Sequence, residues 1–330
     1  MTFRVAVVKN CEPFTLDNSG RFFRAGIMAR EFASTSDCTC DFLVSDFDHY
    51  KKNRKKIGFF QHRDFKKLFI CVIPVFGYKK NFSIMRELSN IFFALLSSCI
   101  ILFRKYNVIV VSYPMPVVAA MIIVVGKLRG IKVHVDCRDV FLFERPTNRK
   151  LLLSALYKAY FNRLTEFVFK ASCSFSFVNE AQVEFARKIN SKLNVTSVFG
   201  IGCDVVYLTN NKRVHGEQLK DLGDANIYLC FAGSLNEYFD FGTIFKAISL
   251  YAGVEKSSCL RFVFAGNGVR SSEFSDMAER FPDLVSFEGW LESDAMVSLL
   301  AKASFGFAPY VDNPNFGGFT NKVSEYLCSN

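Results

Sequence analysis

Apolar runs rich in β-branched residues alternate along the chain with stretches of helical periodicity. Runs of this kind, bounded by turn residues and separated by helix-length segments, are typical of a parallel sheet covered on both faces. In the first part of the chain they predict strands at Phe3–Val8, Cys40–Val44, Leu68–Ile73, Val108–Ser112, Lys132–Val135, Ser174–Val178 and Val195–Val198. Helices are predicted between them at Gly20–Ser34, Ser83–Arg104, Pro116–Gly130, Lys150–Ala171 and Glu180–Ile189.

The pattern weakens near Gly202 into a polar stretch and then begins again. The second series predicts strands at Ile227–Ala232, Leu260–Ala265, Val285–Glu288 and Phe305–Pro309, with helices at Asp240–Tyr251, Ser271–Phe281 and Asp294–Ala303. We therefore expect an α/β protein with two Rossmann-like domains, 1–203 and 226–330, joined by a linker at 204–225. Ligands of open α/β sheets bind beyond the carboxyl ends of the strands, so the loops there are the candidate sites.

Composition narrows the possible functions. The chain has 330 residues, of which 50% are hydrophobic, and a formal net charge of +10. This favours an anionic partner without identifying it. The 11 cysteines are scattered, with no C-x-x-C motif and no histidine pair at metal-ligand spacing, so we expect free thiols in a reducing compartment and no metal site.

Two nucleotide-binding signatures are missing. No Gly-x-Gly-x-x-Gly follows the first strand, where the chain reads Lys9-Asn10-Cys11-Glu12-Pro13, and no Walker motif occurs anywhere. A nicotinamide-dependent dehydrogenase and an ATP-driven motor are therefore both disfavoured.

The loops after the predicted strands carry a series of motifs. In chain order these are Asn18-Ser19-Gly20-Arg21, Ser112-Tyr113-Pro114-Met115-Pro116, Asp136-Cys137-Arg138-Asp139, Gly200-Ile201-Gly202, Ala232-Gly233-Ser234-Leu235, Ala265-Gly266-Asn267-Gly268, Phe287-Glu288-Gly289-Trp290, Ala308-Pro309-Tyr310 and Asn321-Lys322-Val323-Ser324-Glu325-Tyr326-Leu327. Taken together, they resemble the retaining GT-B glycosyltransferases of family 4, and most nearly those that assemble bacterial O-antigen, capsule and exopolysaccharide.

The resemblance implies transfer of a sugar from a nucleotide-sugar donor with retention at the anomeric carbon, with no metal or other cofactor required. We expect the acceptor to be a lipid-linked saccharide. The resemblance also implies that Glu325 accepts hydrogen bonds from the donor ribose. Lys322 stands three residues earlier, on the same helical face, and can offer a cation to the leaving phosphates. The other expected donor contacts are Gly233, Ser234, Gly266, Asn267, Gly268, Tyr310 and Asn321.

The predicted first domain holds the expected acceptor site. Asp136, Arg138 and Asp139 follow a strand and should project from it, where they could orient an acceptor or stabilise developing charge together with Lys322. A purely structural, salt-bridged loop is the competing interpretation. Asn18, Gly20 and Tyr113 are the expected acceptor contacts, and His134 is expected on the sheet rather than in catalysis.

The sequence departs from the family pattern in three ways. Gly317 and Ser234 stand where many relatives have a glutamate and an arginine, which leaves Lys322 as our choice over Arg270 for the cation that meets the diphosphate. Relatives also continue past Glu-Tyr-Leu, so a shortened second domain is expected. The alternatives are a sugar-nucleotide 2-epimerase and a non-catalytic remnant.

A basic, phenylalanine-rich stretch suggests where the protein works. Ten lysines and arginines lie between residues 51 and 80, and such a patch suits an anionic cytoplasmic membrane surface. A basic face that is merely solvated is the competing interpretation. Nucleic-acid binding is disfavoured because no nucleic-acid fold signature accompanies the patch. The apolar run 91–103 is too short to span a bilayer comfortably, so peripheral attachment is expected.

Overall fold

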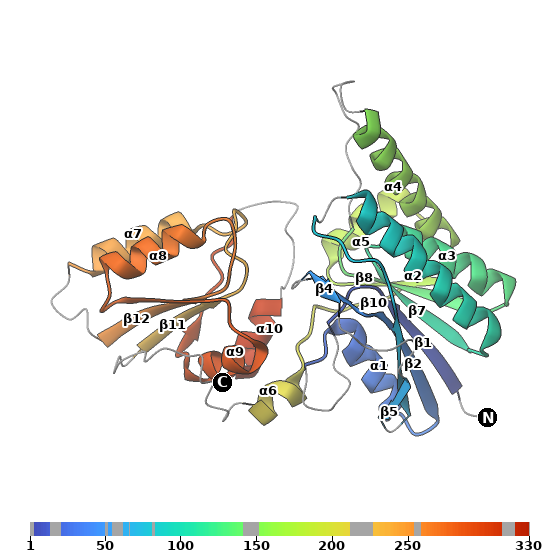
Figure 1. The fold of residues 1–330 in the computed structure, drawn as a ribbon, viewed down its shortest axis with the longest axis horizontal. Helices are drawn as coiled ribbons and strands as arrows, with labels where there is room; N and C mark the ends of the chain where they lie inside the picture. The colour runs from blue at the N-terminus through green and yellow to red at the C-terminus, as the bar shows by residue number, and fades with distance from the viewer. Residues whose placement is uncertain are drawn as a thin grey trace. The chain divides into compact units, whose positions relative to one another are not determined.

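The computed structural model divides the chain into two compact units, Met1–Ile201 and Gly202–Asn330, each with its own sheet and core (Figure 1). The residues that the structure describes are 3–13, 21–49, 52–54, 62–65, 67–80, 83–140, 152–211, 227–253, 259–311 and 321–329.

The first unit is built on an eight-stranded sheet with the order β10-β9-β8-β7-β1-β2-β6-β5. All neighbouring strands pair in parallel except β5, which runs antiparallel to β6. The strands are β1 (Phe3–Lys9), β2 (Cys38–Ser45), β5 (His62–Phe65), β6 (Leu68–Ile73), β7 (Val108–Tyr113), β8 (Lys132–Cys137), β9 (Ser174–Phe177) and β10 (Val195–Val198), with a separate short pair β3 (Phe47–Asp48) and β4 (Asn53–Arg54).

Helices cover both faces of this sheet, because its strands are apolar on both sides. Helix α1 (Arg24–Ser34) packs on one face, over residues of β1, β2 and β6. The opposite face is covered by α2 (Ile84–Phe103), α3 (Pro116–Leu128) and α4 (Leu152–Ala171), with α5 (Glu180–Ile189) beside β9. Helices α2 and α5 begin at Ser83 and Asn179, whose side chains accept the capping hydrogen bonds.

The second unit is built on a smaller parallel sheet with the order β13-β12-β11-β14. Helices α7 and α8 lie on one face of this sheet and α9 and α10 on the other (Figure 1). The elements are α6 (Val205–Asn211), β11 (Ile227–Ala232), α7 (Phe241–Tyr251), β12 (Leu260–Ala265), α8 (Ser271–Arg280), β13 (Val285–Gly289), α9 (Ser293–Lys302), β14 (Phe305–Gly306) and α10 (Asn321–Ser329).

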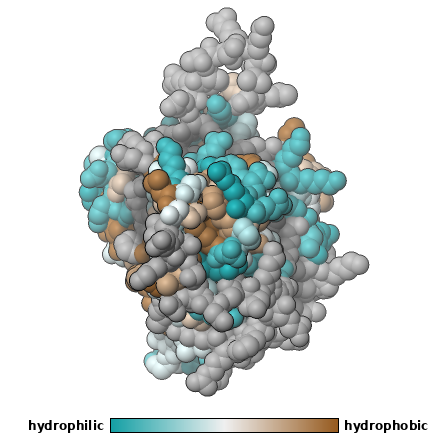
Figure 2. Space-filling model, turned by 90° about the vertical axis from the view of Figure 1, so that its left-hand side faces the viewer, coloured by the Kyte–Doolittle hydropathy of each residue, from teal (hydrophilic) through white to brown (hydrophobic). Residues whose placement is uncertain are grey.

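Much of the phenylalanine content fills the core between this sheet and helices α7 and α8. Phe241 stands edge-to-face against Phe231 and Phe274, with ring centroids 4.9 and 4.7 Å apart. Such pairs add to the burial energy and fix the relative orientation of the elements that carry them. Among the coloured atoms at the centre of Figure 2, brown hydrophobic atoms lie beside teal hydrophilic side chains.

The expected α/β fold with parallel sheets is confirmed, and the differences are local. Helix α1 begins at Arg24 rather than Gly20, after Phe23 in an extended conformation, and β14 has two residues rather than five. The antiparallel strand β5 was not predicted. Residues 205–211 of the expected linker form α6, which packs on α9 and α10.

Candidate functional site

In each unit the strand order reverses beside the first strand of the series. The reversal falls between β1 and β7 in the first unit and between β11 and β14 in the second. Loops leaving neighbouring strands in opposite directions open a crevice at such a switch point, beyond the carboxyl ends of the strands. The charged and titratable side chains that could form a site lie at the switch point of each unit.

In the second unit, Lys322 of α10 lies against the turn that follows β11. Gly233 has a φ of +146°, a conformation that strongly favours glycine, and a Cβ atom at this position would overlap the Cε and Nζ atoms of Lys322. The lysine amino group also lies 4.6 Å from the ring centroid of Phe239 and 5.4 Å from that of Phe231. The missing side chain of Gly233 therefore makes the space that the lysine occupies.

Helix α10 is held in this position by Tyr326, one turn after Lys322. The Tyr326 hydroxyl accepts a 3.0 Å hydrogen bond from the Ala232 amide, and its ring packs so closely on Gly306 that any Cβ there would overlap it. The helix is thus fixed to the last residues of both β11 and β14. Because residues four apart share a helical face, fixing Tyr326 also fixes Lys322.

The glycines of Gly266-Asn267-Gly268 are required by packing between two loops. A Cβ on Gly266 would overlap the carbonyl of Gly233, and one on Gly268 would overlap that of Leu235. Backbone hydrogen bonds join the same loops, from Gly233 to Ala265 at 2.8 Å and from Leu235 to Asn267 at 3.0 Å. Close contact between these two loops therefore explains the glycines.

The remaining expected donor contacts surround this turn or pack nearby. Ser234 is exposed next to Gly233, and Glu325 follows Lys322 by one turn of α10. Tyr310 packs on Phe239 with ring centroids 5.0 Å apart, and Asn321 is the first residue of α10. Arg270 forms a 2.7 Å ion pair with Glu273, which leaves Lys322 as the better placed cation.

Burial lowers the pKa of Lys322, and the nearby Glu325 partly opposes this effect. No described carboxylate lies at ion-pair distance from the lysine amino group. A half-buried ammonium held over two aromatic faces, and not paired with any described carboxylate, is suited to receive an anionic ligand.

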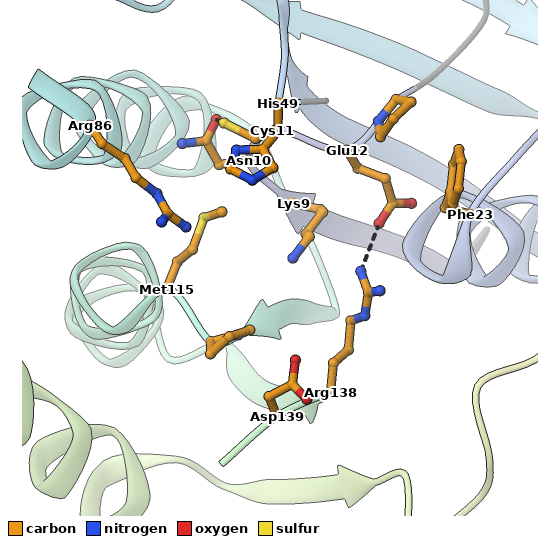
Figure 3. Close-up of a pocket in the computed structure, with 12 residues that line it drawn as sticks. Lys9, Asn10, Cys11, Glu12, Phe23, His49, Arg86, Met115, Arg138 and Asp139 are labelled. Atoms are coloured by element: carbon orange, nitrogen blue, oxygen red, sulfur yellow. Dashed lines mark hydrogen bonds and ion pairs between the residues drawn. The ribbon is translucent and has the colours of Figure 1, made fainter. Parts of the chain in front are cut away.

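The first unit has a pocket of about 170 Å³ at its own switch point (Figure 3). The end of β1, the start of α2 and the loops after β7 and β8 supply its walls. Its lining residues are Lys9, Asn10, Cys11, Glu12, Pro13, Phe23, His49, Arg86, Pro114, Met115, Arg138 and Asp139.

Lys9 and Glu12 are buried charged groups in this pocket. Lys9 is 6% exposed and forms no hydrogen bond or ion pair with any residue that the structure describes. Burial, reinforced by repulsion from Arg138, lowers the pKa of Lys9 to about 8. Burial likewise raises the pKa of Glu12, and the nearby Arg138 opposes this shift.

Glu12 uses its two carboxylate oxygens differently. Its Oε1 accepts a 2.9 Å hydrogen bond from the Gly26 amide, whereas Oε2 is buried without a hydrogen bond and lies 3.8 Å from Nη1 of Arg138 (Figure 3). The pocket thus brings together three charged groups: the unsatisfied oxygen of Glu12, Lys9 without a described partner, and the guanidinium of Arg138. Buried groups in this condition are characteristic of binding sites.

His49 closes another side of the pocket. Its Nδ1 lies 2.7 Å from the Tyr78 hydroxyl and 3.2 Å from the amino group of Lys52. Burial, together with the nearby Lys52 and Arg86, lowers the pKa of His49 to about 4. The ring is therefore neutral at physiological pH.

Two of the expected site residues lie in the core instead. Asp136 is fully buried and accepts two 2.9 Å hydrogen bonds from Arg24 and one of 2.7 Å from Ser176, so the prediction that it projects outward is wrong. Tyr113 is also fully buried, with its hydroxyl 2.7 Å from the Thr165 hydroxyl, so it cannot contact an acceptor. In both cases the strand continues to the residue in question and turns its side chain inward.

The other expected residues of the first unit have different outcomes. Arg138 and Asp139 line the pocket, as a site role requires. Asn18 and Gly20 lie outside the described residues. His134 lies in β8, where its ring nitrogens are 2.8 and 3.0 Å from the hydroxyls of Ser174 and Ser176, so its expected place on the sheet is confirmed.

Sequence reasoning missed Lys9, Glu12, His49 and Arg86. A signal existed for the first two, because Lys9-Asn10-Cys11-Glu12 leaves the carboxyl end of the first strand, but that loop was judged only for its lack of glycines. Over the described ranges, no group of three or more histidine, cysteine, aspartate or glutamate side chains is placed to hold a metal ion.

Comparison with known proteins was informative only at the level of structure. The sequence matches no family model, and no curated protein matches it. Among solved structures, the apo structure of OtsA superimposes over 99% of this chain and 82% of its own, with a TM-score of 0.64 at 10% identity.

Two further structures agree. An α,α-trehalose-phosphate synthase (UDP-forming) from Burkholderia vietnamiensis gives a TM-score of 0.60 at 12% identity, over 99% of this chain and 82% of its own. HepE from Anabaena, solved in complex with UDP, gives 0.54 at 9% identity, over 99% and 79%. Since these are GT-B glycosyltransferases matched along nearly the whole chain, the chain has the GT-B fold.

Proposed function

We propose that this protein is a retaining glycosyltransferase of the family 4 type. In this proposal it transfers a sugar from a nucleotide-sugar donor to a lipid-linked saccharide during bacterial surface polysaccharide synthesis. The observation that carries the proposal is the placement of Lys322 against the Gly233 turn at a switch point of a GT-B chain. HepE, which shares this fold, has been solved with UDP and with UDP-glucose.

The second unit would bind the donor. Lys322 would meet the diphosphate, since its ammonium forms no ion pair with a described carboxylate and lies at the turn. The amide of Gly233 already donates to Ala265, so the exposed Ser234 is the better additional donor to a phosphate oxygen. Glu325, one helical turn away, would accept hydrogen bonds from the ribose.

Catalysis would depend on position and charge. As the bond between the anomeric carbon and the phosphate oxygen breaks, negative charge grows on the departing diphosphate, and Lys322 would stabilise it. The departing phosphate would take the proton of the acceptor hydroxyl as that hydroxyl attacks the same face. This route requires no protein nucleophile and no metal cofactor.

The first unit would bind the acceptor in the pocket around Lys9, Arg138 and Asp139. A buried lysine without a described partner lowers stability, and such a group is usually retained for a function. Lys9 and Arg138 could contact the charged or hydroxyl groups of a saccharide, with Asp139 accepting a hydrogen bond at the rim.

The proposed location is the cytoplasmic face of the membrane, reached through the basic stretch 51–80. Within the described part of that stretch, Lys79 and Lys80 are exposed, whereas Arg54 is paired with Asp46 at 2.5 Å. Lys52 and Lys67 contact the protein itself, and the structure does not describe the side chains of the other basic residues of the stretch.

The decisive experiment compares the purified protein with its Lys322→Ala variant. We expect UDP-, GDP- or dTDP-sugars to raise the melting temperature of the wild-type protein. Lys322→Ala should lower the rate of transfer by about 100-fold or more, because a charge that stabilises the leaving group is lost, while the fold is kept.

The matched control is Lys302→Ala, which removes an exposed lysine from the end of α9 in the same unit. It should leave both measurements unchanged. Normal transfer by Lys322→Ala would remove this residue from the site. Product formation from the donor without any acceptor would indicate an epimerase instead.

A further inference from the structure

Helix α2 has an outward face that carries no polar side chain. The residues on it are Ile84, Met85, Leu88, Phe92, Leu95, Cys99, Leu102 and Phe103. With 3.6 residues per turn, these eight positions fall within about 100° of arc. All are exposed except Phe92, which is half-buried, and Phe103 is 88% exposed.

The opposite face of the same helix packs into the core and combines apolar side chains with the buried polar residues Ser89, Asn90, Ser97 and Ser98. Phe93, Ala94 and Ile101 are fully buried there. The helix is long and apolar enough to cross a membrane by length and composition, but this inner contact holds it on the sheet. A surface helix normally has a polar outer face, so an apolar one that runs its whole length needs a partner.

Exposed cations stand at both ends of this face. Lys79 and Lys80 precede the helix, and Lys105 follows it. Arg129, just after α3, donates a hydrogen bond to the carbonyl of Leu102, which brings Arg129 and its neighbour Lys127 to the same end of the face. None of these five cations forms an ion pair with another described residue.

The nearest acidic groups do not reverse this charge. Asp41 is buried and already binds Arg4 and Arg104. Glu87 accepts hydrogen bonds from Tyr160 and Asn90 and lies about 60° around the helix from the nearest edge of the apolar face. The face is therefore apolar along its length and positive at both ends.

We propose that this face of α2, bounded by the five cations, docks on an anionic lipid surface with the helix lying in the plane of the membrane. Apolar side chains enter the boundary between headgroups and acyl chains, and the cations meet the lipid phosphates. The inference rests on the proposed function and deepens it, since it assigns membrane contact to this helix in addition to the basic stretch 51–80.

Charge argues against a second copy of the chain as the partner. If two α2 faces packed antiparallel, Lys79 and Lys80 of one copy would meet Lys105 and Arg129 of the other. If they packed parallel, each pair of lysines would meet itself. Both arrangements bring like charges together, which is destabilising, whereas an anionic bilayer matches both ends.

The same helix connects the membrane to the pocket. Arg86 lines the pocket, while its neighbours Ile84, Met85 and Leu88 lie on the apolar face. One helical turn therefore carries both surfaces. A lipid-linked acceptor held in the bilayer would have its polar end presented near the pocket of this unit.

The test is flotation of the full chain with phosphatidylcholine vesicles that contain or lack phosphatidylglycerol. We expect the wild-type protein to float with the anionic vesicles. The double variant Leu95→Gln/Phe103→Gln should bind them at least about tenfold more weakly, because two exposed apolar anchors are lost. The triple variant Lys105→Gln/Lys127→Gln/Arg129→Gln should weaken binding and make it less sensitive to salt.

The matched control is Val206→Gln/Leu250→Gln, which changes two residues of similar exposure in the second unit and should bind as the wild type does. Stabilisation by a nucleotide-sugar should persist in every variant, so loss of membrane binding is distinguishable from failure of the proposed function. Equal flotation of Leu95→Gln/Phe103→Gln and the wild type would overturn the inference. The inference would also be overturned if sedimentation showed the wild-type protein to be a dimer and Leu95→Gln/Phe103→Gln to be a monomer.

Discussion

At the scale of single residues, the two candidate sites share one feature, a lysine that is removed from water and forms no ion pair with a carboxylate that the structure describes. Lys322 rests on aromatic rings at the Gly233 turn, and Lys9 is buried at the end of β1. Both have a lowered pKa, and in both cases burial is the main cause. An anion that enters such a site binds the charged form and recovers part of the cost of burial.

For Lys9 this reasoning predicts opposite effects on stability and activity. Replacement by methionine, Lys9→Met, removes a buried charge and keeps the volume, so the free energy of unfolding at pH 7 should rise by roughly 2–3 kcal/mol. The rate of transfer should fall about tenfold or more. Urea unfolding and an acceptor-dependent transfer assay measure the two effects.

The stability gained by Lys9→Met should depend on pH, and this dependence shows whether the gain comes from removing the buried charge. Because the pKa of Lys9 is about 8 in the folded protein and near 10.5 when unfolded, the penalty is complete below pH 8 and fades as the pH rises to about 10.5. The stability gained by Lys9→Met should fade over the same range. Lys188→Met, on the exposed side of α5, should change neither measurement, and unaltered transfer by Lys9→Met would exclude Lys9 from acceptor binding.

At the scale of secondary-structure elements, side chains buried between elements hold the site loops in place. Arg24 at the start of α1 forms a two-pronged ion pair with Asp136 at the end of β8, and a third bond of 2.8 Å reaches the Gly200 carbonyl. This joins three segments that lie far apart in the sequence. In the second unit, Tyr326 joins α10 to β11 and β14 in the same way.

Breaking the Arg24–Asp136 pair should be costly. Arg24→Met leaves the Asp136 carboxylate buried without its cation, and we expect a loss of about 3–5 kcal/mol in the free energy of unfolding. Arg30→Met changes an arginine on the same helix whose pair with Glu31, at 3.5 Å, is on the surface, and should cost less than about 1 kcal/mol.

Chemical denaturation of both variants measures the difference. The double variant Arg24→Met/Asp136→Asn should recover part of the loss, since no unpaired charge then remains buried. If Arg24→Met lowers the free energy of unfolding no more than Arg30→Met does, Asp136 is not paired with Arg24 in the core. It would then project from its strand, as the sequence analysis expected.

At the scale of the whole molecule, burial of titratable groups makes global stability depend on pH. The folded protein holds His49 neutral down to about pH 4, whereas an unfolded chain protonates this histidine near 6.5. Between these values the unfolded state binds more protons, so His49 makes stability rise with pH over that interval.

The variant His49→Gln should lose this part of the pH dependence. We expect the wild-type protein to lose about 1–2 kcal/mol more than the variant between pH 6.5 and 4, the full shift being reduced because the ring is partly exposed. Urea midpoints measured at half-unit steps of pH would show it. Above pH 7 the two curves should run parallel, and parallel curves across the acid range would contradict the assignment.

Sequence alone determined most of the elements, because the period of the apolar residues and the turn residues between them are local properties. The strands Leu68–Ile73 and Val195–Val198 and the helix Glu180–Ile189 have the predicted bounds. The choice of Lys322 at the second switch point was also made from the sequence, through the resemblance of its motif. Short elements such as β5 and α6 were not predicted, since they carry too few apolar positions to form a pattern.

Only the tertiary structure decided which way each site residue points. Asp136, Arg138 and Asp139 are close neighbours in sequence, yet only Asp136 turns into the core. It does so because it pairs there with Arg24, which is 112 residues away in the sequence. Lys9 became a candidate only when the fold placed it beside Glu12 and Arg138 without a described partner for its charge. Local patterns specify where a chain is helical or extended, whereas charge pairing and burial depend on residues that meet only after folding.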